Sequence, residues 1–412
     1  MAFLPLYLGS FAIPRNPRIW IFGASDGRGL AGNTRYLASY VKKYCRDIRP
    51  VWLTSEPRVC AKVRELGIEC HMKYSIRGFA LAAKAKAFFI THHLFDLNPF
   101  VSGGAQIIQT WHGIPLKKIE FDTIDDGVYK SFLLAREPFG VLVRKSHTFR
   151  RGWLLATSSE TARTLSSGFL APPERVWITG YPRNDVLYSD EFPLLREELS
   201  LKAELEATRR MLPGVWVGLY APTFRLHGRG AVERFFMDVS QVSRLEHMLE
   251  KANIVLYLKL HPMELERLKT LKQDSGLRLS RLRVFTAEDV NPLLRHFDFL
   301  VTDYSSIYFD YLLLDRPLLF FPFDLDEYSR SRGLYYRYEE VTPGPKAYSF
   351  DEWLLALAHV RETAFSWSSF RQRLRDRFFL HQDGKSSARV VDRVRALLGL
   401  RGIDGNLLEQ SG

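Results

Sequence analysis

Two histidines and an arginine have the side-chain types needed for acid–base and phosphate chemistry. His112 follows a tryptophan and precedes a Gly-x-Pro turn in the segment 109–118 (QTWHGIPLKK). Because imidazole titrates near neutral pH, His112 could remove a proton from an attacking hydroxyl. Arg225 and His261 each follow an apolar run and could donate hydrogen bonds to a pyrophosphate while one of its bonds breaks. For all three the alternative is a purely structural role.

A second candidate site is the segment 297–311 (FDFLVTDYSSIYFDY), which is typical of a buried strand turning into a helix. We expect Asp303 or Ser305 to be the N-cap of that helix. The first turn of a helix presents unpaired backbone N–H groups and the positive end of the dipole, so a phosphate can bind there. The hydroxyls of Ser305 and Ser306 add donors. The alternative is that this segment only caps a helix.

Alternating strands and helices are expected to position these residues. Apolar runs predict strands at 18–23, 51–54, 68–70, 87–91, 106–110, 153–158, 175–179, 216–221, 254–260, 283–285, 297–301 and 317–321. Helices are expected at 32–44, 57–66, from 159, up to 210, at 232–251, 263–271 and 291–295, and in a tail from 350 with a break at 381–387. This alternation is typical of α/β proteins with parallel sheets, which bind ligands beyond the carboxyl ends of their strands.

The chain of 412 residues is long enough for two domains, which we expect at 1–185 and 186–385, followed by a helical tail at 386–412. The two domains are expected to face one interdomain cleft. Neither the glycine-rich turn 23–29 nor any other segment has the spacing of a dinucleotide or Walker A loop, which favours a nucleotide-diphosphate donor over ATP hydrolysis.

Composition and charge restrict the compartment and the partners. No apolar run is long enough to cross a membrane, and the apolar segment 1–14 makes a poor signal peptide, so we expect a cytosolic protein. Three cysteines without paired spacing argue against a disulfide framework or a zinc site, so we expect buried or incidental thiols. The net charge of +12 indicates polyanionic partners.

Basic and apolar side chains alternate in the segment 128–153, which could lie on an anionic bilayer. An ordinary pair of surface helices is the alternative. Nucleic acid is not expected as a partner, because the basic residues are not gathered into one recognition helix and the aromatic residues follow no RNA-recognition signature.

Five motifs, in this order, resemble the CDP-glycerol glycerophosphotransferase family of teichoic acid and capsule synthesis: 109–118 (QTWHGIPLKK), 180–185 (GYPRND), 220–225 (YAPTFR), 259–262 (KLHP) and 302–306 (TDYSS). Segments 20–23, 343–345 and 383–386 resemble its outer markers. The resemblance implies a GT-B fold with two Rossmann-like domains. It also implies transfer of glycerol phosphate, or a related polyol phosphate, from a CDP-activated donor to a hydroxyl of a lipid-linked or polymeric acceptor, with release of CMP.

The resemblance also assigns roles to individual residues. His112 matches the catalytic base, and His261 serves both catalysis and donor binding. The donor's pyrophosphate site comprises Thr223, Arg225, His261, Asp303, Ser305 and Ser306, with Asp303 shaping the turn. The acceptor side or cleft comprises Trp111, Gly113, Arg183, Asn184 and Asp185. No metal ligand or cofactor is expected, and a divalent cation is compatible with the site but not indicated.

Two departures from the family pattern bear on the product. The segment 32–34 (GNT) differs from the commoner Asp-Asn-Ser-like sequence, and the long N-terminal extension of large polymerising members is lacking. These leave open the acceptor, the polyol and the number of units added. We expect a protein bound peripherally to the inner face of the cell membrane. A GT-B glycosyltransferase using a nucleotide sugar is the alternative.

Overall fold

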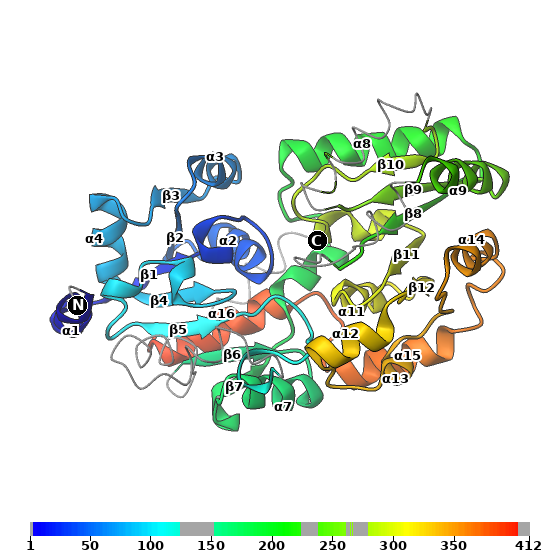
Figure 1. Cartoon of the computed structure of the whole chain (residues 1–412). Helices are drawn as coiled ribbons and strands as arrows, with labels where there is room; N and C mark the ends of the chain where they lie inside the picture. The colour runs from blue at the N-terminus through cyan, green and yellow to red at the C-terminus, as the bar shows by residue number, and fades with distance from the viewer. Residues whose placement is uncertain are drawn as a thin grey trace. The chain divides into compact units, whose positions relative to one another are not determined.

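The computed structural model describes residues 3–123, 152–223, 238–260, 264, 266 and 279–402, and its chain forms two compact units (Figure 1). Unit 1 comprises 1–114, 119–195 and 378–412, and unit 2 comprises 115–118 and 196–377. The first boundary therefore falls after Leu195 and not after Asp185. The helix α16 (Ser386–Leu397) is part of unit 1, whereas the sequence predicted a separate tail.

Unit 1 is built on a seven-stranded sheet with the order β3-β2-β1-β4-β5-β6-β7, in which every pair is parallel. The strands are β1 (Asn16–Phe22), β2 (Arg49–Thr54), β3 (Glu69–Met72), β4 (Ala85–Ile90), β5 (Gln106–Gln109), β6 (Trp153–Ala156) and β7 (Val176–Ile178). The strand order reverses between β1 and β4. The crevice beyond the carboxyl ends at such a reversal is the usual ligand site of an open α/β sheet.

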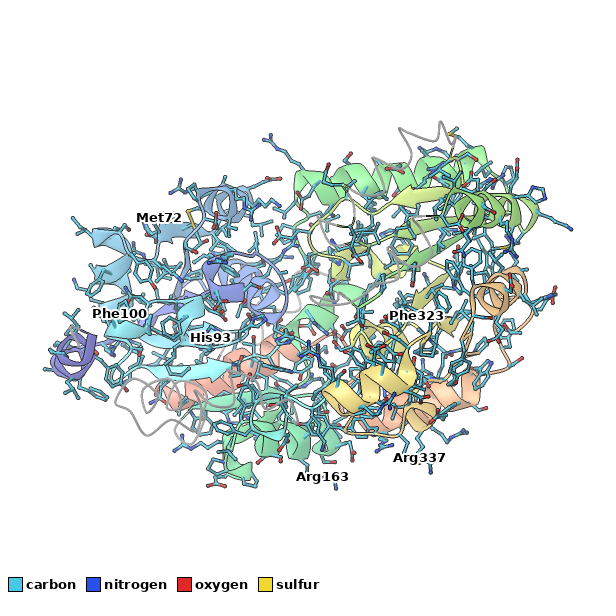
Figure 2. The ribbon with its side chains drawn as sticks, in the orientation of Figure 1. Met72, His93, Phe100, Arg163, Phe323 and Arg337 are labelled. Atoms are coloured by element: carbon cyan, nitrogen blue, oxygen red, sulfur yellow. A yellow bond between two sulfur atoms is a disulfide. The ribbon has the colours of Figure 1, made fainter. Side chains whose placement is uncertain are left out.

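Six α-helices accompany this sheet in the described part of the chain: α1 (Phe3–Gly9), α2 (Asn33–Tyr44), α3 (Pro57–Glu65), α4 (Ile76–Lys84), α7 (Ser159–Gly168) and α16. The predicted strands and the helices α2, α3 and α7 are confirmed. Parallel strands that are buried on both faces are continuous apolar runs in the sequence, which makes them recognisable. The helix α4 was not predicted. At the end of the unit near α1, Phe100 stacks on Tyr74 with ring centroids 6.0 Å apart (Figure 2).

Unit 2 has a five-stranded parallel sheet with the order β10-β9-β8-β11-β12. Its strands are β8 (Trp216–Tyr220), β9 (Ile254–Leu258), β10 (Leu282–Val284), β11 (Phe299–Thr302) and β12 (Leu318–Phe320). Its helices are α8 (Arg196–Met211), α9 (Val239–Lys251), the 3-10 helix η9 (Asn291–His296), α11 (Ile307–Leu312), α12 (Leu325–Arg332), α13 (Tyr338–Val341), α14 (Phe350–Ala358) and α15 (Ser368–Phe378).

A buried tryptophan organises the core of unit 2. Trp353 of α14 stacks on Phe321 at 5.1 Å and packs against Tyr220 of β8 at 5.4 Å, and all three side chains are fully buried. This cluster fixes the helix against the carboxyl ends of the strands that carry the candidate donor-site residues. The predicted helix 263–271 and the start of the predicted helix 232–251 lie outside the described residues, except for 264 and 266, which are helical.

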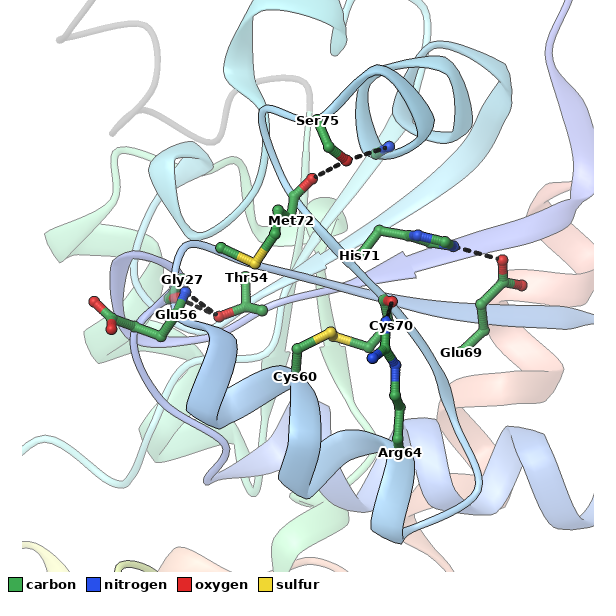
Figure 3. The surroundings of a disulfide bond; sticks show 11 residues. Gly27, Thr54, Glu56, Cys60, Arg64, Glu69, Cys70, His71, Met72 and Ser75 are labelled. Atoms are coloured by element: carbon green, nitrogen blue, oxygen red, sulfur yellow. Dashed lines mark hydrogen bonds and ion pairs between the residues drawn. A yellow bond between two sulfur atoms is a disulfide. The ribbon is translucent and has the colours of Figure 1, made fainter.

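The cysteines correct one expectation. Cys60 of α3 and Cys70 of β3 form a disulfide, with their Cα atoms 5.5 Å apart, and are not incidental thiols (Figure 3). The pairing arises because α3 leads directly into β3 and folds back against it, which brings residues ten positions apart within bonding reach. Cys45 is a buried free thiol, as expected. In the part of the chain that the structure describes, every helix is too short or too polar to span a lipid bilayer.

Candidate active site

His112 lies in the loop after β5, at the carboxyl edge of the unit 1 sheet. Its ring is half-buried, and its Nδ1 atom is 3.2 Å from the backbone oxygen of Thr91, at the end of the neighbouring strand β4. A carbonyl oxygen can only accept a hydrogen bond, so Nδ1 must carry the proton. A neutral ring then has its lone pair on Nε2. This is the tautomer in which imidazole can act as a base through Nε2.

Aromatic rings enclose His112. The ring of His92 stacks on it with centroids 4.4 Å apart and planes 14° apart, and the ring of Trp111 lies 3.9 Å away. Trp111 is 5% exposed and meets the edge of Phe169 at 4.9 Å. The imidazole is therefore held in one orientation by rings as well as by the hydrogen bond to Thr91.

The motif 180–185 reaches the same loop. The guanidinium Nη1 of Arg183 donates to the backbone oxygen of His112, and the hydroxyl of Tyr181 donates to the backbone oxygen of Gly113 at 3.3 Å. Arg183 and Asn184 lie in the 3-10 helix η7 (Pro182–Leu187) and are only 7% and 4% exposed. The structure thus brings Trp111, His112, Gly113 and Arg183 together, as the sequence suggested.

Asp185 from the same motif has a different environment. It is 2% exposed, and its two carboxylate oxygens accept the backbone N–H groups of Ser386, at 2.8 Å, and Ser387, at 2.7 Å, at the start of α16. Burial raises the pKa of Asp185, and the hydrogen bonds from both serines oppose that rise. These contacts favour a structural role as the cap of α16. The predicted place of Asp185 and Asn184 on the acceptor side stays a prediction.

A polar network beyond the ends of β1 and β4 holds Thr91, the residue whose backbone oxygen contacts His112. The buried carboxylate of Asp96 accepts hydrogen bonds from the backbone N–H groups of Asp26 (2.7 Å), Thr91 (2.7 Å) and His92 (2.9 Å), and from the Thr91 hydroxyl (3.1 Å). Asp96 thereby fixes the residue whose carbonyl orients His112. In the sequence His92 directly follows the predicted strand 87–91, and nothing in the sequence singled out Asp96.

The ligand atoms of Asp26, His93 and Asp96 lie within 4.8 Å of one another, so this group could hold a metal ion (His93 is labelled in Figure 2). However, the Asp96 carboxylate already accepts four hydrogen bonds. The Lys73 ammonium group also donates to the backbone oxygen of Asp26 at 2.8 Å, which brings a positive charge close to the group. The arrangement therefore fits a network that holds loops together better than it fits a metal centre.

In unit 2, Asp303 connects the ends of two adjacent strands, β8 and β11. Its buried Oδ1 atom accepts hydrogen bonds from the backbone N–H and hydroxyl of Thr223, at 2.8 and 2.6 Å, and from the N–H of Tyr304, at 2.6 Å. Asp303 therefore shapes the turn. It does not occupy the N-cap position of α11, which is Ser306.

The predicted N-cap of the helix α11 is wrong. The residue before α11 is Ser306, and neither Asp303 nor Ser305 occupies that position. Ser306 has a helical backbone, and its side chain makes no capping hydrogen bond. Ser305 and Ser306 are both half-buried, and they follow Asp303, whose carboxylate accepts the N–H of Thr223. Arg225 and His261, both predicted for the donor site, lie outside the described residues.

Comparisons with known proteins place the chain in a family. Residues 6–396 match the family model of CDP-Glycerol:Poly(glycerophosphate) glycerophosphotransferase. The teichoic acid ribitol-phosphate polymerase TarK of Staphylococcus aureus is 31% identical over 293 residues, which cover 69% of this chain and 51% of TarK. The teichoic acid glycerol-phosphate transferase of the same organism is 26% identical, and the match covers 92% of this chain and 93% of that protein. The chain spans about half the length of several of the curated relatives it matches.

Solved structures show the same fold. The wall teichoic acid polymerase TagF superposes with a TM-score of 0.73 at 23% identity, covering 96% of this chain and 93% of that chain. This likeness, together with the two parallel sheets, confirms the predicted GT-B fold. Since the family model covers nearly the whole chain, the protein belongs to the CDP-glycerol:poly(glycerophosphate) glycerophosphotransferase family.

Proposed function

We propose that the protein transfers glycerol phosphate, or a related polyol phosphate, from a CDP-activated donor to a hydroxyl of a lipid-linked or polymeric acceptor in teichoic acid or capsule synthesis. The observation that carries this proposal is the hydrogen bond from Nδ1 of His112 to the Thr91 oxygen at 3.2 Å, which leaves Nε2 as the basic atom, in a chain that belongs to this family. The two S. aureus relatives act on glycerol phosphate and ribitol phosphate according to their names, which supports a polyol phosphate as the group transferred.

In the proposed reaction, Nε2 of His112 takes the proton of the acceptor hydroxyl. The acceptor oxygen then forms a bond to the donor's β-phosphorus, which carries the polyol. The bond from that phosphorus to the bridging oxygen breaks, and CMP leaves with the electron pair. Hydrogen-bond donors at the bridging oxygen favour this step because negative charge develops there. We assign that task to Arg225 and His261.

The rest of the donor site is proposed along β8 and β11. The hydroxyls of Ser305 and Ser306 are half-buried and would donate to the pyrophosphate. Asp303 supports them indirectly, because it accepts two hydrogen bonds from Thr223 and so fixes the end of β8 beside the serine pair.

The test is CMP release from CDP-glycerol in the presence of a synthetic lipid-linked acceptor, with mass analysis of the product. The His112→Gln variant should lose turnover while it keeps its calorimetric affinity for CDP-glycerol. The His71→Gln variant is the matched control, because His71 is a half-buried histidine of the same sheet that pairs with Glu69. Retained turnover in His112→Gln would reject the base assignment, and a product carrying hexose would reject the polyol phosphate in favour of a nucleotide-sugar glycosyltransferase.

We further propose that the protein binds an anionic membrane surface at the inner face of the cell membrane. The net charge of +12 supports this, as do Leu6, Leu8 and Phe11, which are 49%, 57% and 54% exposed on or just after the uncharged helix α1. The predicted membrane-facing segment 128–153 lies outside the described residues except for its last two.

Sedimentation with phosphatidylglycerol vesicles tests the membrane proposal. The double variant Leu8→Ser with Phe11→Ser should sediment less than the wild type, whereas Leu355→Ser, which changes a leucine that is 62% exposed on α14, should not differ. Equal sedimentation of all three proteins would remove α1 from the proposed membrane surface.

A further inference from the structure

Trp111 has a backbone conformation that its own side chain disfavours. Its φ angle is 56°, in the left-handed region that is sparsely populated by residues other than glycine and is a clear outlier for a bulky side chain. Such a conformation persists only where the surrounding structure holds it, and it often occurs at functional sites. Trp111 immediately precedes His112, so whatever holds Trp111 also sets the position of the proposed base.

One buried side chain holds both peptide groups that flank the Trp111 Cα atom. The amide Nδ2 of Asn33 donates to the backbone oxygen of Thr110 at 2.8 Å and to that of Trp111 at 2.9 Å. The first oxygen belongs to the peptide before the Trp111 Cα atom and the second to the peptide after it. Both backbone torsions of Trp111 are therefore constrained by a single amide group.

The orientation of the Asn33 amide is itself fixed. Its Oδ1 atom accepts the backbone N–H of Arg183 at 3.1 Å, and the side chain is fully buried at the first residue of α2. Because carbonyl oxygens only accept and an N–H only donates, these three contacts are compatible with one amide orientation. The guanidinium of Arg183 in turn donates to the backbone oxygen of His112.

Asn33 and Arg183 together thus hold three consecutive carbonyl groups, those of Thr110, Trp111 and His112. We infer that Asn33 is a positioning residue, which holds Trp111 in the left-handed conformation and so places His112 for proton transfer. This inference rests on the proposed function, in which His112 is the base. It also requires an amide at position 33. An aspartate of equal size would place a carboxylate oxygen against the two carbonyl oxygens of Thr110 and Trp111 and would repel them.

The test compares Asn33→Asp with a variant that softens the same helix elsewhere. Val41→Ala removes two methyl groups from a fully buried side chain of α2 that is not part of the loop network. The Asn33→Asp variant should lower kcat about 100-fold, the effect of displacing a catalytic group by about 1 Å, and leave the affinity for CDP-glycerol unchanged. Val41→Ala should lower the Tm and keep kcat. Equal kcat values for the two variants, or an Asn33→Asp defect confined to KM, would overturn the inference.

A double-mutant cycle separates positioning from general support. Glycine adopts positive φ without strain, so in the Trp111→Gly background the additional Asn33→Asp change should lower kcat by less than about 10-fold. A full loss in that background would mean that Asn33 acts in some other way than by holding Trp111. If Asn33→Asp does not fold, Asn33→Ser is measured in the same assays with the same expected direction.

A readout without turnover keeps this inference distinct from the proposed function. The ring-nitrogen NMR signals of His112 can be identified by their absence in His112→Gln. They should shift in Asn33→Asp and not in Val41→Ala, whether or not CDP-glycerol is the donor. Unchanged signals in Asn33→Asp would overturn the positioning role, whereas shifted signals in a protein that releases no CMP would reject only the proposed function.

Discussion

Replacing Asp185 with alanine tests whether this residue acts on the fold or on the acceptor. The carboxylate is 2% exposed and accepts the N–H groups of Ser386 and Ser387 at 2.8 and 2.7 Å, in the first turn of α16. Alanine leaves both buried N–H groups without an acceptor. Each such group costs about 1–3 kcal/mol, and loss of a negative charge at a helix N-terminus adds about 0.3–1 kcal/mol.

The desolvation of Asp185 reduces this sum. Burial raises its pKa, so the folded state binds the proton more tightly than the unfolded state does. Between the unfolded and folded pKa values, the stability contributed by this group therefore falls as pH rises, and at neutral pH the buried charge carries a cost that alanine does not have. We expect a net loss of about 3 kcal/mol for Asp185→Ala and about 1 kcal/mol for Asp185→Asn, since asparagine keeps one acceptor.

Urea unfolding followed by tryptophan fluorescence measures this difference, with CMP release measured on the same samples below the transition. The control is Asp383→Ala, because Asp383 accepts the N–H of Lys385 beside the same helix but its side chain is 47% exposed. Exposed pairs contribute about 0–1 kcal/mol, so this variant should unfold almost as the wild type does. An Asp185→Ala protein that has lost turnover but unfolds at the wild-type urea concentration would refute the capping role and place Asp185 on the acceptor.

Two further predictions concern thiol chemistry and pH. Burial raises the pKa of Cys45 to about 12, so iodoacetamide should label no thiol in the folded protein. Without reductant it should label one thiol in urea, and after reduction in urea it should label all three. Labelling of the native protein would contradict the burial of Cys45. Burial lowers the pKa of His296 to about 4, so the unfolded chain takes up this proton below pH 6.5 and the folded protein does not. Stability present above pH 6.5 is thus lost as pH falls toward 4, by less than about 1.4 kcal/mol per pH unit for this partly exposed ring, and His296→Gln should flatten urea midpoints measured between pH 5 and 7.

Most strands could be predicted because they are short apolar runs that end in a polar turn. The helix α2 was predicted to within one residue, since Gly32, with φ at 73°, separates it from the preceding turn. The helix α4 was missed because its alanine-rich sequence runs directly into β4, with no glycine or proline between the two elements. Local periodicity gives no means of dividing such a stretch.

The residues of the candidate site could be selected from local sequence, but their contacts could not. The type of residue and its place after a strand sufficed to select His112 and Asp303. The contacts that set their geometry come from far along the chain: Asn33 reaches Thr110, and Thr223 reaches Asp303. The sequence therefore suggested Asp303 or Ser305 as a helix cap, whereas the tertiary bonds from Thr223 direct the Asp303 carboxylate elsewhere.

The conformation of Trp111 is more informative about function than its burial is. A left-handed conformation for a bulky residue costs about 1–3 kcal/mol, and glycine at this position would avoid that cost. The two hydrogen bonds from Asn33 and the one that the Trp111 N–H donates to Gln109 at 3.0 Å contribute about 0.5–1.5 kcal/mol each, which is enough to offset it. Glycine would lack the ring that packs on Phe169 and lies 3.9 Å from His112. A fold that strains its backbone to keep an aromatic ring beside an imidazole is better explained by the orientation of that imidazole than by the stability of the loop.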